Sequence, residues 1–315
     1  KKRNLRIPHR AISSVSQTSN PKKLAIFSWC LYDFANTIFS MNVISLYFAL
    51  WVTVDHDGQD ILYSTALSLS MLAVALSVPV FGALSDTTGK RRAPLIGLTL
   101  LCIFSTGLIG TTDHLWTGLI LFMVANYGYQ SALVFYNGML PSISQGSHVG
   151  LVSGYGVALG YLGSIIGMLM VKPFVESGGR SSAFLPTAGL LLLFSLPCFL
   201  FVKDRETRSV PFFRIKEAFN TLKKTFLRAR QYHTLFRFIL IHFLVLDAVN
   251  TIIAFMSIYA SKVIGFDDGQ IIKFLISSTV GAMIGSLIIG ILVKRKGTIW
   301  SYWLVLGLWI VSLSL

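Results

Sequence analysis

Long apolar runs recur along the chain, separated by short polar segments, and each is about as long as a membrane-crossing helix. A helix needs about 20 mostly apolar residues to cross a hydrocarbon core about 30 Å thick. A membrane-spanning strand would need only about 10 residues of alternating polarity, and these runs do not alternate. The pattern therefore predicts an all-α membrane protein with nine spans, at residues 24–52, 61–84, 93–110, 115–140, 151–172, 183–202, 235–260, 271–293 and 299–315.

The composition agrees with a chain that lies mostly in lipid. Of the 315 residues, 54% are hydrophobic and 13% are charged, and the mean hydropathy is +0.68. Soluble domains carry about 25% charged residues. We therefore expect a multi-pass integral membrane protein in contact with membrane lipids.

The formal net charge of +14 raises the question of a nucleic-acid partner, which the distribution of the charge answers. If the N-terminus is cytoplasmic, 23 of the 27 Lys and Arg residues fall on the cytoplasmic side, in segments 1–23, 90–92, 203–237 and 294–296. An excess of Lys and Arg in cytoplasmic loops is typical of membrane proteins. Topology explains the basic balance, and no nucleic-acid partner is expected.

Two internal matches indicate that the chain contains a repeat. The motif D-x-x-N-T-I begins at Asp33 and again at Asp247, and "GALSDTTGKRR" at 82–92 is matched by "GILVKRKG" at 290–297, at offsets of 214 and 208 residues. The repeat predicts a six-helix bundle at 24–202 and the first three helices of a second, pseudo-symmetric bundle at 235–315. A basic cytoplasmic tail at 1–23 and a cytoplasmic connector with an amphipathic helix at 203–234 complete the expected organisation.

Several stretches resemble a known family of carriers. The pattern G-x-x-x-D-x-x-G-K-R within 82–92 resembles the loop signature of the major facilitator superfamily. The stretches "LYDFANTIF" at 31–39, "VFYNGMLPSIS" at 134–144 and "GYGVALGYLGSIIG" at 154–167 look like its vacuole-effluxer-like branch, which includes bacterial proteins and a fungal vacuolar amino-acid exporter.

The resemblance implies a major facilitator fold and a twelve-helix carrier that works by alternating access and is monomeric at full length. It also implies the bacterial inner (plasma) membrane as location, with the N-terminus in the cytoplasm. The chain begins without Met and ends inside an apolar run, so we expect a fragment that lacks helices 10–12.

Polar residues inside the first and seventh spans are candidates for a solute or proton site. Asp33 and Asn36 are three residues apart and share a helical face, and Asp247 with Asn250 repeats the pair. Ionisable residues within a membrane span are costly and usually face a bundle interior or a wet cavity. We expect the two pairs to face each other across the pathway. The structural alternative is that each Asp caps a broken helix or bonds a neighbouring backbone group.

The fourth span carries a polar stripe. Asn126, Gln130 and Asn137 fall within about 40° of one another at about 100° per residue, and Tyr129 and Tyr136 flank them. The stripe is expected to line the solute site. Because polar side chains also join helices to one another in membranes, a purely structural stripe is the alternative.

The resemblance assigns a gate to the turn between spans 2 and 3. We define the gate loop by its matching residues: Gly82, Asp86, Gly89, Lys90, Arg91 and Arg92. Glycine permits a tight turn and close helix contact, and an Asp can bond a basic side chain or a facing helix N-terminus.

A second glycine pattern lies in span 5. Gly156, Gly160, Gly163 and Gly167 recur at four, three and four residues and predict a face where another helix approaches closely.

These features favour a secondary active transporter of a small polar solute, with amino acids suggested by the resemblance and protons as a candidate coupling ion. The alternative is a transport-inactive relative that serves as a membrane sensor or assembly subunit. An enzyme is not expected, because the sequence shows no nucleophile paired with a base, no metal-ligand cluster and no phosphate-binding loop. No metal and no cofactor are predicted.

The expected topology can be tested by cysteine labelling. A cysteine at Gly58, in an expected outer loop, and one at Asn220, in the basic connector, should react with an impermeant thiol reagent from opposite sides of the membrane. Labelling of both positions from the same side would contradict the topology.

Overall fold

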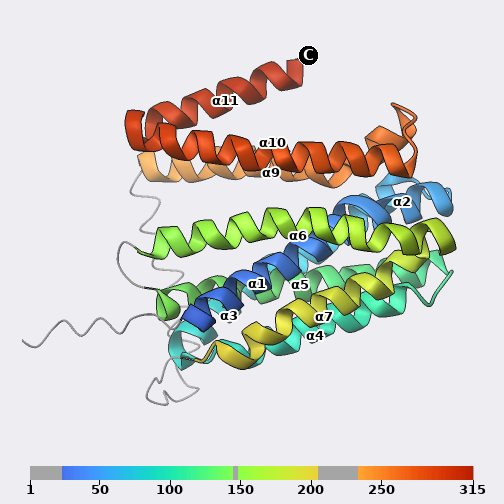
Figure 1. The fold of residues 1–315 in the computed structure, drawn as a ribbon, viewed down its shortest axis with the longest axis horizontal. Helices are drawn as coiled ribbons and strands as arrows, with labels where there is room; N and C mark the ends of the chain where they lie inside the picture. Colours follow the sequence, from blue (N-terminus) through green and yellow to red (C-terminus); the bar gives the residue numbers. More distant parts are fainter. Residues whose placement is uncertain (1–22, 145–147, 205–232, 315) are drawn as a thin grey trace, which may run out of the picture.

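The computed structural model describes residues 23–144, 148–204 and 233–314, and this part of the chain is helical and contains no strand. Helices suit a bilayer, where every backbone polar group must find a partner within the protein. The helices run side by side along the long axis of the molecule (Figure 1). They are α1 (Lys23–Phe39), η1 (Ser40–Tyr47), α2 (Phe48–Leu50), η2 (Trp51–Asp55), α3 (Asp60–Thr88), α4 (Arg92–Ile109), α5 (Leu115–Ile143), α6 (His148–Gly178), η3 (Arg180–Ala183), α7 (Phe184–Phe201), α9 (His233–Lys262), α10 (Asp268–Lys296) and α11 (Thr298–Ser314).

Eight helical segments among the described residues are long and apolar enough to cross a membrane. The ninth expected span forms the shorter apolar helix Ile299–Ser312 within α11. The prediction of an all-α membrane protein is confirmed. The expected basic tail and the amphipathic helix of the connector fall on residues 1–22 and 205–232, which lie outside the described residues.

The loops between the long helices alternate between two ends of the molecule (Figure 1). One end, here called the basic end, carries Lys90, Arg91, Arg92, Lys203, Arg295 and Lys296. The opposite end, here called the acidic end, carries Asp55, Asp57, Asp60, Asp113, Glu176, Asp267 and Asp268. The assignment of the basic end to the cytoplasm stays a prediction.

The first span is a continuous helix over Lys23–Asp55 and is the most buried of the spans, with 78% of its apolar window inside the protein. From Ser40 onward it includes two π-helical segments, η1 and η2. Such π-helical turns are rare and are often found at functional sites. Tyr63 of α3 donates to Ile44 O at 2.7 Å, and Asn42 donates to Gly167 O of α6 at 3.3 Å.

The glycine pattern of span 5 is where α6 meets α1. A Cβ added to Gly163 would lie 2.4 Å from the backbone oxygen of Phe34, and one added to Gly167 would lie 2.9 Å from the Ile38 side chain. Only glycine permits so close an approach between helices. The expectation of a close-packing face on α6 therefore agrees with the contact that the structure shows.

The second half of the chain packs against the first half near the acidic end. Phe255 of α9 meets Tyr63 of α3 edge to face, with ring centroids 5.5 Å apart. Ile258, Ala260 and Ile271 share a core cluster with residues of the first span. Toward the basic end, residues 236–244 of α9 are exposed, so the described contacts between the halves gather at one end (Figure 1).

Gly58 proves unsuited to carry a labelling cysteine. It is buried, and a Cβ added there would lie 2.5 Å from Val52 O. Gln59 is its exposed neighbour and is the better position for the outer label.

The glycine face of α6 gives a stability prediction. Gly163→Ala should lower the free energy of unfolding by about 1–3 kcal/mol, because the new methyl group meets backbone rather than a movable side chain. Gly154→Ala is the matched control in the same helix, since no heavy atom lies within 4 Å of its added Cβ. Melting curves in detergent measure both. An equal melting temperature for the two variants would contradict the packing role.

Candidate functional site

Asp33 lies on the side of α1 that meets the glycine face of α6. Its Oδ2 is 3.3 Å from the position of a Cβ at Gly160 and 3.5 Å from that at Gly156. Its backbone oxygen accepts a hydrogen bond from Thr37 Oγ1 at 2.8 Å. Its half-buried carboxylate has no hydrogen-bond or ion-pair partner within the described part of the chain. Among these residues, it therefore caps no helix end.

An aromatic pair lies beside Asp33. The Trp29 ring stacks on Tyr136 of α5 with centroids 4.4 Å apart, and its Nε1 donates to Tyr136 O at 3.1 Å. A Cβ at Gly156 would meet this same ring at 2.9 Å. One glycine thus makes room for both the indole ring and the carboxylate. Trp29 is not among the residues expected from the sequence, although its position four residues before Asp33 places it on a neighbouring part of the helix face.

Several buried polar atoms of the first half have no partner within the described residues. Asn36 is 3% exposed and its Nδ2 is unpaired, as are Tyr136 Oη and Asn42 Oδ1. Buried polar groups are nearly always hydrogen-bonded in folded proteins. Asn36 lies one turn from Asp33 and Tyr136 stacks on Trp29, so their unpaired atoms are available to a ligand beside Asp33.

The second-half pair is placed differently from the first. Asp247 and Asn250 of α9 are both exposed, and no hydrogen bond or ion pair joins them to Asp33 or Asn36 in the described residues. The physical reason is that α9 contacts the first half mainly near the acidic end. The expected arrangement of the two pairs across a pathway stays a prediction.

The polar stripe of the fourth span is divided among different surroundings along α5. Asn126 is fully buried and donates to Ser70 of α3 at 2.7 Å. Gln130 is half-buried, and Asn137 is exposed. A helix in a bundle meets different neighbours along its length, so residues on one face need not share one surface. Asn126 therefore joins two helices, which is the structural alternative given for the stripe.

The gate loop begins at the end of α3 and forms a turn at the basic end. Gly89 ends α3 with φ 64°, a conformation that favours glycine, and its N–H donates to Ser85 O at 3.0 Å. Gly82 is half-buried with open space around it, and Lys90 is exposed. Asp86 lies in the last turns of α3, and its side chain lies outside what the structure describes.

Arg91 ties the gate loop to two other helices. Its Nε donates to Ser85 Oγ at 2.8 Å, and its Nη1 donates to the backbone oxygen of Gly138 in α5. Gly138 brings the α5 backbone to this guanidinium, since a Cβ there would lie 3.1 Å from Arg91 Nε. The gate loop is thereby fixed against α3 and α5 in this structure.

A carboxylate that the sequence analysis missed completes this network. Asp204, just beyond the end of α7, accepts hydrogen bonds from the backbone N–H groups of Arg91 and Arg92 through one oxygen, both at 2.8 Å. The site is the N-terminus of α4, where free N–H groups and the helix dipole favour an anion. Asp204 lies 112 positions beyond Arg92 in the chain, so no local pattern pointed to it.

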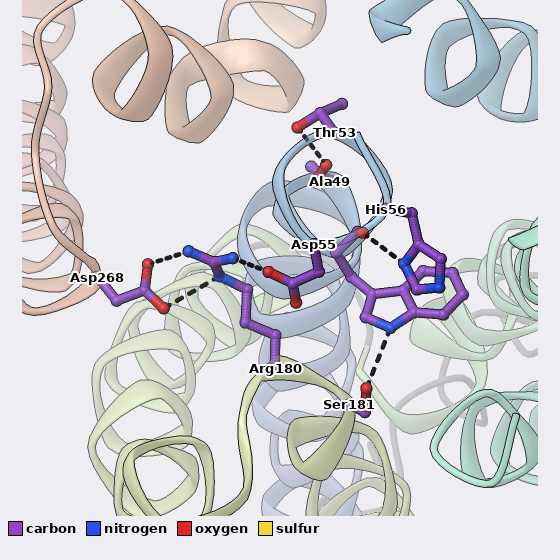
Figure 2. A network of polar contacts seen from close by, with 8 residues as sticks. Ala49, Thr53, Asp55, His56, Arg180, Ser181 and Asp268 are labelled. Atoms are coloured by element: carbon purple, nitrogen blue, oxygen red, sulfur yellow. Dashed lines mark hydrogen bonds and ion pairs between the residues drawn. The ribbon is translucent and has the colours of Figure 1, made fainter. Parts of the chain in front are cut away.

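A second polar network lies at the acidic end (Figure 2). The Arg180 guanidinium is held between the carboxylates of Asp55, at the end of the first span, and Asp268, at the start of α10. Trp51 Nε1 donates to Ser181 Oγ at 3.1 Å, and His56 Nε2 lies 2.9 Å from Asp113 O. These contacts connect the loops of the acidic end and include one element of the second half.

No group of three or more His, Cys, Asp or Glu side chains within the described residues could hold a metal ion. The three cysteines, Cys30, Cys102 and Cys198, are buried and unbonded to one another.

Comparison with known proteins identifies the family. The model of the Major Facilitator Superfamily matches residues 32–315. The chain is 28% identical over 288 residues to a Bacillus subtilis protein described as an uncharacterized MFS-type transporter, YxiO, covering 85% of this chain and 67% of that protein. It is 26% identical over 298 residues to an uncharacterized protein of Aquifex aeolicus, covering 90% of this chain and 72% of that protein.

The role of Asp204 can be tested by hydrogen exchange. Asp204→Ala removes the acceptor at the start of α4 and should cost about 0.5–2 kcal/mol of local stability, so amide exchange at Arg91 and Arg92 should accelerate. Lys203→Ala, which changes the exposed neighbour, is the matched control. If the amide hydrogen-exchange rates of residues 88–95 are the same in both variants, Asp204 does not hold the gate loop.

Proposed function

The chain belongs to the major facilitator superfamily, and from that premise we propose that it is a secondary active transporter that moves a small polar solute by alternating access. In this proposal the solute or proton site is built around Asp33. The family relation points to a transporter rather than an enzyme, and the apolar helices make the chain a multi-pass membrane protein.

The single observation that carries the proposal is the unpartnered carboxylate of Asp33. An ionised side chain near the middle of a span costs about 2.5–3.5 kcal/mol on insertion scales. The Lys and Arg residues of the described first half lie at helix ends, except Lys172, which lies in the last two turns of α6 and is paired with Glu176. Those at the helix ends are Lys23, Lys90, Arg91, Arg92, Arg180 and Lys203. Within the described residues, no Lys or Arg is therefore paired with the charge of Asp33, and a proton or a cationic group of the solute is the natural partner.

The surroundings of Asp33 suit a small polar solute. The unpaired Asn36 Nδ2 and Tyr136 Oη can hydrogen-bond a ligand, and the stacked rings of Trp29 and Tyr136 lie beside Asp33. An amino acid would bring an ammonium group for Asp33 and a carboxylate for the amide and hydroxyl donors. The resemblance to the vacuole-effluxer-like branch, which includes an amino-acid exporter, supports this choice of substrate class.

The second half would supply the facing part of the site. Asp247 and Asn250 repeat the first-half motif, and their exposure on α9 leaves them available to a solute. Gln130 and Asn137 of α5 would add polar groups along the route toward the basic end. We propose that the gate loop closes that end, with the basic end in the cytoplasm and the protein in a bacterial inner membrane.

The test is the substitution Asp33→Asn, which keeps the side-chain size and removes the charge. Exchange of labelled amino acids in liposomes should fall by at least about tenfold, or its dependence on pH between 5 and 8 should disappear, because the lost ion pair or proton site is worth more than about 1.4 kcal/mol. The melting temperature should change little, since this carboxylate bonds no described residue.

Asp57→Asn is the matched control, since Asp57 is an exposed carboxylate at the acidic end with φ 48°, a conformation that Asn adopts readily. Normal exchange by Asp33→Asn across this pH range would show that the carboxylate is structural. Misfolding of Asp33→Asn alone would favour the structural alternative as well.

A further inference from the structure

We propose that Arg180 and Asp268 form a latch that closes the pathway at the acidic end by joining the two halves of the transporter, and that the latch releases when this end opens. The latch rests on the alternating access of the proposed function. It assigns a conformational role to residues that are far from Asp33 in the chain.

The geometry of the contact is that of a specific two-point pair. Arg180 Nη2 donates to Asp268 Oδ1 at 2.7 Å, and Arg180 Nε donates to Asp268 Oδ2 at 3.1 Å. Two parallel charge-assisted bonds of this kind are strong and depend on orientation. Figure 2 shows the guanidinium directed at the carboxylate of α10 across the boundary between the halves.

The pair is shielded more than an ordinary surface ion pair. The side chains of Arg180 and Asp268 are 15% and 31% exposed, whereas those of Lys262 and Asp60, a second ion pair between the halves with a 2.6 Å separation, are 38% and 50% exposed. Exposed pairs contribute little because water and salt screen them. Arg180 and Asp268 are therefore the main polar link between the halves in the described residues, and Lys262 with Asp60 is an auxiliary one.

Asp55 allows the latch to release without leaving the Arg180 charge unpaired. It belongs to the first half, as Arg180 does, and it remains bonded to the guanidinium when Asp268 moves away. Removing one partner of a shielded ion pair is strongly destabilising when the other charge is left uncompensated. Here the arginine keeps a counter-ion in both states.

Asp268 also has a second source of stabilisation. It lies in the first turn of α10, where the helix dipole favours a negative charge, and the capping box between Asp267 and Gln270 fixes this helix start. After release, Asp268 would stay at a favourable helix terminus exposed to water. Both partners therefore have a stable arrangement in the open state, as a reversible latch requires.

The first half holds Arg180 in place for this contact. Gly179 precedes it with φ 75°, a turn conformation that favours glycine, and the next residue, Ser181, accepts a hydrogen bond from Trp51 Nε1 at 3.1 Å. The arginine is thus presented by a rigid turn of the first half, and the motion of α10 decides whether the latch is closed.

The experiment measures opening directly. Ala260, in α9, is fully buried in the core cluster shared by the two halves, so a cysteine there reports exposure of this interface. The full-length protein carrying Ala260→Cys is placed in lipid nanodiscs and treated with a hydrophilic thiol reagent. The same protein without this cysteine gives the background from the buried Cys30, Cys102 and Cys198.

Asp268→Asn should raise the labelling rate by about tenfold, because charge-assisted hydrogen bonds are lost in the closed state only.

Asp55→Asn keeps the link between the halves and should change the rate by less than about threefold. Glu176→Gln is the matched control, since it removes a pair with Lys172 that lies at the same end but within α6. Lys262→Gln should have a smaller effect than Asp268→Asn. If Asp268→Asn fails to fold, Arg180→Lys is the second variant. It keeps the positive charge but cannot donate two parallel hydrogen bonds to Asp268, so it should raise the labelling rate as well.

An unchanged labelling rate in Asp268→Asn, or an equal rise in Asp55→Asn and Glu176→Gln, would overturn the latch. The labelling rate can be measured without a known solute, so failure of the latch and failure of the proposed transport function can be told apart. Normal solute exchange with labelling unaffected by Asp268→Asn overturns the latch alone. A tenfold rise in labelling supports the latch even if no solute is exchanged, and in that case the proposed transport function is the one that fails.

Discussion

The close approach of α1 and α6 is the contact on which the rest of the first half depends. At Gly163 the α6 backbone meets the α1 backbone with no side chain between them, and Gly156 and Gly160 open the space that the Trp29 ring and the Asp33 carboxylate occupy. Lipid tails are as apolar as the helix surfaces, so membrane helices are joined by packing rather than by exclusion of water. The glycines therefore determine both the cohesion of the bundle and the place of the Asp33 carboxylate, which has no partner within the described residues.

The interior of the first half combines satisfied and unsatisfied polar groups, and the difference is informative. Asn126 Nδ2 donates to Ser70 and holds α5 to α3, although Asn126 Oδ1 has no partner within the described residues. Asn36 Nδ2 and Tyr136 Oη have no partner there either. A buried polar atom without a partner is unfavourable, and more so where the dielectric constant is low. Asn36 lies on α1 and Tyr136 on α5, the two helices that also supply Asp33 and the Trp29–Tyr136 stack. A polar solute that enters this region would compensate them.

The two ends of the molecule are held in different ways. At the basic end, Asp204 and Arg91 link elements of the first half to one another. At the acidic end, Arg180 links the first half to α10 of the second. In the described residues the halves are thus joined by polar contacts at one end only. An arrangement of this kind suits a protein whose two ends open in turn, since the cohesion of each half does not depend on the contact that must break.

The sequence by itself determined the membrane class, the helical fold, the places of the spans and the family, because a bilayer imposes long apolar runs and internal backbone bonding. It also identified the glycine face of α6 and the motif at Asp33, since spacing along a helix defines a face. Only the tertiary structure decided which neighbour each face meets. Three hydrogen-bonded contacts join residues that are far apart in the chain: Asp204 with the start of α4, Asp268 with Arg180, and Ser70 with Asn126. Similar polar residues in a sequence look equivalent until packing gives one a partner and leaves another, such as Asp33, without one.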